Sequence, residues 1–227
     1  MLPKKYLSLA VFLIASIGEV VMPIFGVNHL HVFFKPMIMV GLVGYYWVMS
    51  SNRSFLFVVA LLFCWLGDVL LIFVSTNELF FMGGLTGFLA GHILYIFCYR
   101  KFQNPSSSNE LLGSQKVRFS FPIILYGTGL VSILYSSLSG LKIPIVIYAL
   151  AITVMAVTAL LRYGRTTKKS FVFIFIGAIL FLISDSILAL NKFKHAFDSA
   201  SFWIMLTYCV AQFLIVQGAL LHEERKG

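Results

Sequence analysis

Apolar residues run through this chain in long stretches that short polar connections separate. Each stretch approaches the roughly 20 mostly apolar residues that an α-helix needs to cross a lipid bilayer. We therefore predict an all-α, polytopic membrane bundle of about eight transmembrane helices. The predicted spans are 5–26, 32–50, 54–75, 79–100, 117–138, 143–163, 170–191 and 199–221.

The first stretch has the position of a secretory signal peptide, but its sequence does not fit one. It is long enough to span a bilayer, and Glu19, Met22 and Pro23 occupy the place of a small-residue cleavage motif. We expect a retained helix.

Composition indicates that lipid surrounds most of these side chains. Of the 227 residues, 60% are hydrophobic and 11% are charged, whereas a soluble domain has about 45–50% apolar and about 25% charged residues. The eight stretches use most of the chain and leave no room for a soluble domain. We expect a single transmembrane domain over 1–227, in an integral, multi-pass protein of a bacterial plasma (inner) membrane.

The Lys and Arg residues that give the chain its net charge of +9 are unevenly distributed between the two sides of the membrane. When the ends of the spans are numbered in turn, one side of the membrane collects thirteen Lys and Arg residues, and the other collects three besides Lys35. Because Lys and Arg are enriched at cytoplasmic ends of spans, both termini are predicted to be cytoplasmic. This distribution predicts contact with membrane lipid and no nucleic-acid partner.

The connection between the fourth and fifth spans, 103–116, is polar and is expected to be a flexible cytoplasmic loop. It divides the domain into halves 1–103 and 117–227. LGDVL at 66–70 resembles ISDSI at 183–187, and Lys and Pro residues open both the second and the sixth spans. These short matches are compatible with a parallel 4+4 pseudo-repeat and equally with none.

Ionisable residues inside the spans are the most informative feature of the sequence. Glu19, Asp68 and Asp185 each lie about 14–16 residues from the predicted cytoplasmic start of a span, which corresponds to roughly 20–24 Å of helix. Lys35 lies at the outer end of the second span. A charge in the bilayer costs about 2.5–3.5 kcal/mol on insertion scales, so these four groups predict a functional layer beyond the midplane.

Uncharged polar groups extend this candidate site. His92 and Tyr95 lie in the fourth span, and Tyr208 and Gln212 share one face of the last span at i, i+4 spacing. Small residues allow close helix packing, so the glycine-bearing face of the fourth span is expected to meet the bundle interior. The glycines on that face are Gly84, Gly87 and Gly91.

Each of these residues also has a purely structural interpretation. Glu19 and Lys35 could pair with each other and fasten the first two helices. Asp68 and Asp185 could form interhelical hydrogen bonds that stabilise packing, and His92 could do the same.

Common catalytic motifs are absent from the sequence. It contains no phosphate-binding glycine loop, serine-hydrolase elbow or HExxH motif. The three cysteines, Cys64, Cys98 and Cys209, all lie inside predicted spans and indicate neither a disulfide framework nor a zinc site. We therefore predict no metal and no cofactor.

Five short motifs in the spans resemble the lysoplasmalogenase (YhhN-like) family of small eight-span membrane proteins. Each motif is weak alone, but the five occur in order and in helices of the right parity over nearly the whole chain. They are FKP at 34–36, LGDVLL at 66–71, GFLAGHILY at 87–95, GAILFLISD at 177–185 and YCVAQ at 208–212.

The resemblance implies an ether hydrolase that cleaves the vinyl ether bond of a lysoplasmalogen. The products would be a fatty aldehyde and glycerophosphocholine or glycerophosphoethanolamine. Such chemistry needs one protonated carboxyl group and one carboxylate, as in glycoside hydrolysis. We expect Asp68 and Asp185 as catalytic acid and base, in either order. The expected contacts of the lysophospholipid substrate are Glu19, Lys35, His92, Tyr95, Ser184, Tyr208 and Gln212.

A proton-coupled transporter of small molecules or lipids is the alternative function, because buried acids and internal repeats also occur in such carriers. The chain is small for a carrier, and no clear pair of broken helices appears in it. A lipid-binding scaffold without turnover is a third interpretation. The sequence leaves the oligomeric state open.

Overall fold

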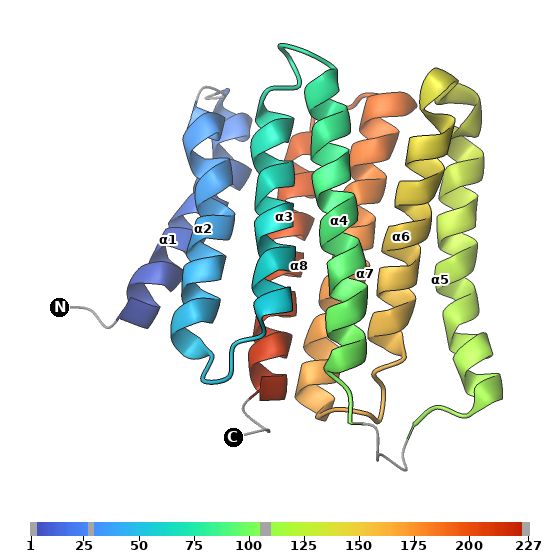
Figure 1. Ribbon diagram of the computed structural model, residues 1–227. Helices are drawn as coiled ribbons and strands as arrows, with labels where there is room; N and C mark the ends of the chain where they lie inside the picture. Colours follow the sequence, from blue (N-terminus) through green and yellow to red (C-terminus); the bar gives the residue numbers. More distant parts are fainter. Residues whose placement is uncertain (1–3, 27–29, 105–109, 224–227) are drawn as a thin grey trace. The chain divides into compact units, whose positions relative to one another are not determined.

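The fold is described from a computed structural model that covers residues 4–26, 30–104 and 110–223 (Figure 1). Eight α-helices account for most of these residues, and no strand occurs among them. Short 3-10 turns, η1 (Met22–Phe25), η3 (Tyr135–Ser137) and η4 (Ser139–Leu141), extend helix ends. The helices are α1 (Lys4–Val21), α2 (His31–Met49), α3 (Phe55–Ile72), α4 (Leu79–Lys101), α5 (Gly113–Leu134), α6 (Lys142–Leu160), α7 (Lys168–Phe193) and α8 (Ala200–Glu223).

The prediction of an all-α chain with eight spans is confirmed. In the described part of the chain, eight helices are long and apolar enough to cross a membrane, and they coincide with the predicted stretches to within a few residues at most ends. Part of the predicted flexible loop, 105–109, lies outside the described residues. The cytoplasmic location of the termini and the 4+4 repeat stay predictions.

The chain forms two compact units. The first unit comprises Met1–Tyr95 together with Glu223–Gly227, and the second comprises Ile96–His222. In Figure 1, successive helices run in opposite directions from α1 through α2 to α3 in the first unit, and from α5 through α6 to α7 in the second. The boundary after Tyr95 falls inside α4, and that after His222 falls at the last residue of α8.

Local sequence signals set the helix ends. Ser54 and Thr167 cap α3 and α7, where their side chains accept hydrogen bonds from backbone N–H groups three residues on, at 3.4 and 3.2 Å. Gly26 ends η1 at φ 73°, and Gly164 lies in the turn after α6 at φ 71°. Glycine is favoured at both places because this left-handed conformation is costly for other residues.

Glycines bring the helices of the first unit into backbone contact. A Cβ atom added to Gly41 of α2 would lie 2.6 Å from the Phe12 nitrogen of α1. One added to Gly87 of α4 would lie 3.0 Å from the Gly67 nitrogen of α3. The predicted inward orientation of the glycine face of the fourth span is therefore confirmed.

In the second unit, glycines likewise bring the backbones of α7 and α8 into contact. A Cβ atom on Gly177 would lie 2.9 Å from the Ala211 carbonyl oxygen, and one on Gly218 would lie 2.9 Å from the Ile174 nitrogen. Small residues at such positions let helices gain van der Waals contact where lipid provides no hydrophobic driving force.

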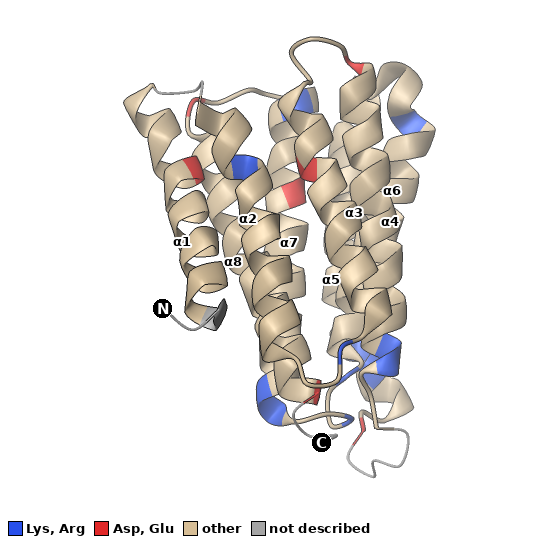
Figure 2. Cartoon of the chain, turned by 60° about the vertical axis from the view of Figure 1, so that its left-hand side comes forward, with Lys and Arg blue, Asp and Glu red and all other residues tan. Residues whose placement is uncertain are grey.

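Large apolar side chains cover the outside of both units. Phe55 is 82% exposed, and Leu79 and Ile143 are each 73% exposed. Figure 2 shows that charged residues of either unit are sparse along the helices and gather near helix ends. An apolar surface of this extent is stable only in lipid, so the protein is an integral, multi-pass membrane protein.

Candidate functional site

Three ionisable residues of the first unit lie near the same end of its helices. Glu19 is in the last turn of α1, Lys35 in the second turn of α2 and Asp68 in the last two turns of α3. Because these helices alternate in direction along the chain, the three positions have a similar depth, roughly 3–6 Å of helix from the nearest α-helix end. Glu19 is therefore closer to the end of its helix than the sequence analysis expected.

Asp68 is 2% exposed, and it lies where α3 and α4 touch. Its neighbour Gly67 approaches the backbone of α4 at Gly87. His92 is fully buried, and its ring stacks on Phe88 at a centroid distance of 6.5 Å. Since the next glycine of α4, Gly91, packs on Cys64, His92 is level with the turn of α3 that precedes Asp68.

Tyr95 is buried near the opposite end of α3. Its ring centroid lies 5.7 Å from that of Phe57, the third residue of α3, and Phe57 lies 4.9 Å from Tyr46. Phe57 and Asp68 are separated by eleven residues, or roughly 16 Å of helix. The structure therefore places Tyr95 away from the Asp68 level.

Glu19 contacts His31, the first residue of α2, instead of Lys35. The Oε1 atom of Glu19 pairs with His31 Nδ1, whereas its Oε2 atom has no hydrogen bond among the described residues. Glu19 is 2% and Lys35 8% exposed. The expected Glu19–Lys35 pair is not formed in the described part of the first unit. His31 was missed by the sequence analysis because it stands at a helix end, where a histidine is unremarkable.

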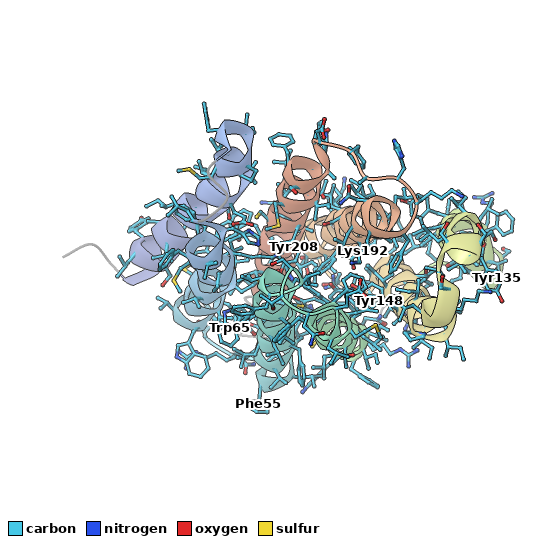
Figure 3. The ribbon with its side chains drawn as sticks, turned by 90° about the horizontal axis from the view of Figure 1, so that it is seen from above. Phe55, Trp65, Tyr135, Tyr148, Lys192 and Tyr208 are labelled. Atoms are coloured by element: carbon cyan, nitrogen blue, oxygen red, sulfur yellow. The ribbon has the colours of Figure 1, made fainter. Side chains whose placement is uncertain are left out.

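Asp185 is half-buried in α7 of the second unit. The hydroxyl group of Tyr148, from α6, donates a hydrogen bond to its Oδ2 atom. In Figure 3, Tyr148 and Tyr208 lie among the helices of the second unit and Tyr135 at its edge, in agreement with their burial. Tyr148 was not predicted, because one tyrosine in an apolar span carries no sequence signal of its own.

The other predicted residues of the second unit are buried and hydrogen-bonded. Ser184 donates to the Ile204 carbonyl oxygen of α8 at 2.9 Å, which ties α7 to α8. Gln212 Nε2 lies 3.4 Å from the Tyr208 hydroxyl oxygen, and the Tyr208 ring packs edge-on against Phe181. The predicted common face of Tyr208 and Gln212 is confirmed. Asp68 and Asp185 belong to different units.

Another buried carboxyl group of the first unit lies at the opposite end of α2 from Lys35. Glu223 is 6% exposed and accepts hydrogen bonds of 2.5 Å from both Tyr46 and Ser50. The Tyr46 hydroxyl in turn accepts from the Ser54 N–H at 2.9 Å. These bonds hold the end of α2, the start of α3 and the last described residue of the chain together.

Arg162 of the second unit, one of the thirteen Lys and Arg residues assigned above to the predicted cytoplasmic side, is fully buried. It donates to the Phe102 carbonyl oxygen at 3.3 Å, the Ser170 carbonyl oxygen at 3.2 Å and the Ser170 hydroxyl at 2.8 Å. Burial lowers the pKa of Arg162 to about 10, so the group stays protonated at neutral pH. It fastens the start of α7 to the ends of α4 and α6.

No group of three His, Cys, Asp or Glu side chains in the described ranges is arranged to hold a metal ion. What the structure offers chemically is a set of buried carboxyl groups within apolar helices. Such groups can donate or accept protons in a medium of low dielectric constant.

These features define a polytopic membrane protein with acidic groups buried in its spans. The profile of the YhhN family matches residues 30–219, and the chain belongs to this family. It is similar to human lysoplasmalogenase TMEM86B, with 29% identity over 181 residues, which cover 79% of this chain and 70% of the human protein. No solved structure matches the chain.

Proposed function

We propose that this protein hydrolyses the vinyl ether bond of lysoplasmalogens within the membrane. The family membership and the lysoplasmalogenase among its relatives support this reaction. The single observation that carries the proposal is the burial of Asp68, at 2% exposure, in an apolar helix at a backbone contact. A carboxyl group within a span is costly, and such groups usually have a function.

The reaction needs one proton donor and one proton acceptor. A carboxylic acid transfers its proton to the carbon of the double bond that is remote from the ether oxygen, which leaves an oxocarbenium ion. A carboxylate stabilises this cation and takes a proton from the water that attacks it. The resulting hemiacetal collapses to an aldehyde, and its hydroxyl proton goes to the departing glycerol oxygen. One water molecule is consumed in total.

We assign the two carboxyl roles to Asp68 and Asp185, in either order. Tyr148 is then a positioning residue, because its hydrogen bond fixes the direction of one Asp185 oxygen. The alkenyl chain of a single-chain lipid would lie among apolar helices, and its headgroup would lie near the membrane surface. His92 in the first unit and Ser184, Tyr208 and Gln212 in the second stay the proposed substrate contacts, whereas Tyr95 lies away from the Asp68 level.

The test is a comparison of two lysolipids that differ only in the linkage at the first carbon of glycerol. Purified protein in detergent is incubated with the vinyl ether lipid or with its saturated ester counterpart, and products are measured by mass spectrometry. We expect fatty aldehyde and the glycerophospho-headgroup from the first lipid, and no fatty acid from the second. Fatty acid release from the ester at a comparable rate would refute vinyl ether specificity.

A further inference from the structure

Two ionisable side chains at one end of the first unit, Glu19 and Lys35, are each less than a tenth exposed and have incomplete polar contacts among the described residues. Glu19 Oε2 has no hydrogen bond among the described residues, and Lys35 forms neither a hydrogen bond nor an ion pair there. One turn before Glu19, the Ser16 hydroxyl is buried and equally without a partner. A buried charge is expensive unless it is paired and hydrogen-bonded. Within the described residues, this end of α1 and α2 therefore leaves a carboxyl oxygen and an ammonium group available to a ligand.

The geometry keeps the two charges adjacent but separate. Lys35 follows His31 by four residues on α2 and so shares a face with it, and His31 pairs with Glu19. The helices also touch one residue away, where a Cβ atom on Gly18 would lie 2.7 Å from the Phe34 ring. An acceptor and a cation at neighbouring positions, not bonded to each other, match a ligand that carries both charges.

We propose that Glu19 and Lys35 bind the headgroup of a phosphoethanolamine lysolipid. Lys35 pairs with the phosphate, and Glu19 Oε2 accepts hydrogen bonds from the primary ammonium group. His31, which is 35% exposed, holds the other oxygen of Glu19 and thereby orients the carboxylate. The identity of the ligand as a lysolipid rests on the function proposed above.

Depth and donor chemistry both favour this ligand. Glu19 and Lys35 lie within two turns of the ends of their helices, where a helix meets the headgroup region of the bilayer. A primary ammonium group has three N–H donors for a carboxylate oxygen. The quaternary ammonium of choline has none and is recognised mainly by aromatic faces. The site should therefore prefer ethanolamine and lose affinity as the nitrogen is methylated.

The test measures binding without turnover. A series of 1-O-alkyl lysolipids, with ethanolamine, monomethyl-, dimethyl- and trimethyl-ethanolamine headgroups, contains no carboxylic ester or vinyl ether to cleave. Binding to the full chain in lipid nanodiscs is followed by tryptophan fluorescence. We expect Kd to rise about tenfold or more from ethanolamine to choline, as the loss of hydrogen bonds to a charged group implies. Equal Kd values across the series would overturn the proposal.

Two variants locate the effect. Glu19→Gln should flatten the methylation series, whereas Lys35→Met should weaken all four lipids by a similar factor. Asp198→Asn and Lys194→Met are matched controls, because both residues are exposed in the connection between α7 and α8, and neither should change the series. Retention of the graded series in Glu19→Gln would remove Glu19 from the site.

Failure of this inference and failure of the proposed function give different results. Aldehyde release from a vinyl ether lipid combined with a flat binding series would leave the hydrolase and remove the headgroup site. A graded series without aldehyde release would leave the headgroup site and remove the hydrolase. Equal Kd values on the parent protein overturn this inference even if a variant fails to fold.

Discussion

Gly87→Ala tests the close approach of α3 and α4 beside Asp68. The added Cβ atom would lie 3.0 Å from the Gly67 nitrogen, 3.1 Å from its Cα and 3.2 Å from the Phe63 carbonyl oxygen. Carbon atoms pack favourably at about 3.5–4.0 Å, so the two backbones must separate by roughly 0.5 Å. No flexible side chain can yield in their place, because all three neighbours are backbone atoms.

The expected cost follows from a comparison with Gly129→Ala in α5. Nothing lies within 4 Å of a Cβ atom at Gly129. Both substitutions gain the roughly 0.5–1 kcal/mol by which alanine exceeds glycine in a helix, so this gain cancels in their difference. Overpacking alone then remains, at about 1–3 kcal/mol. At about 2–4 °C per kcal/mol for a chain of this length, Gly87→Ala should unfold several degrees below Gly129→Ala.

Activity provides the second measurement of this prediction. A misplacement of about 1 Å can cost 10²-fold in rate, so a shift near 0.5 Å beside Asp68 should lower turnover roughly tenfold. Both variants are purified in one detergent, and thermal unfolding at one scan rate is compared with aldehyde release. Equal unfolding temperatures and equal turnover in the two variants would show that α3 and α4 do not touch at Gly87.

Three further predictions follow from the polar contacts. Asp68→Asn and Asp185→Asn should each elute and unfold like the parent but lose about 10²–10⁴-fold in kcat. The kcat of the double variant should be little lower than that of the more impaired single variant. Near-parent turnover in either single variant would remove that residue from the mechanism. Tyr148→Phe should lower kcat by less than Asp185→Asn does, with KM nearly unchanged, and equal losses in the two variants would contradict a mere positioning role. A hydrogen bond to Lys116 and the nearby Arg165 guanidinium hold the pKa of the Glu110 carboxyl below its usual value. The stabilising contribution of Glu110 is therefore present above pH 4.5 and declines as the pH falls through the lowered pKa. If the difference in unfolding temperature between the parent and Glu110→Gln grew on acidification, this sign would be wrong.

The number of helices and their approximate limits follow from the amino-acid sequence alone. Lipid offers no hydrogen-bond partners, so the backbone N–H and C=O groups of a spanning segment must bond to one another. For an apolar stretch of about 20 residues that lacks the alternating pattern of a β-barrel strand, the α-helix is then the stable structure. The glycine spacing in α4 also predicted its packing face, because a face that carries Gly84, Gly87 and Gly91 can approach another backbone closely. Both features depend on periodicity along one helix.

The partners of the buried polar groups, in contrast, become visible only once the helices are packed together. Glu19 contacts His31 although Lys35 was the expected partner, Asp185 receives a hydrogen bond from Tyr148, and Arg162 is buried against carbonyl oxygens. These pairings depend on how far each helix is rotated and shifted against its neighbour. Close packing of many apolar side chains sets that rotation, and their contacts are individually weak and similar for many residue types. Hydropathy therefore locates a buried charge along its helix but does not identify the side chain that binds it.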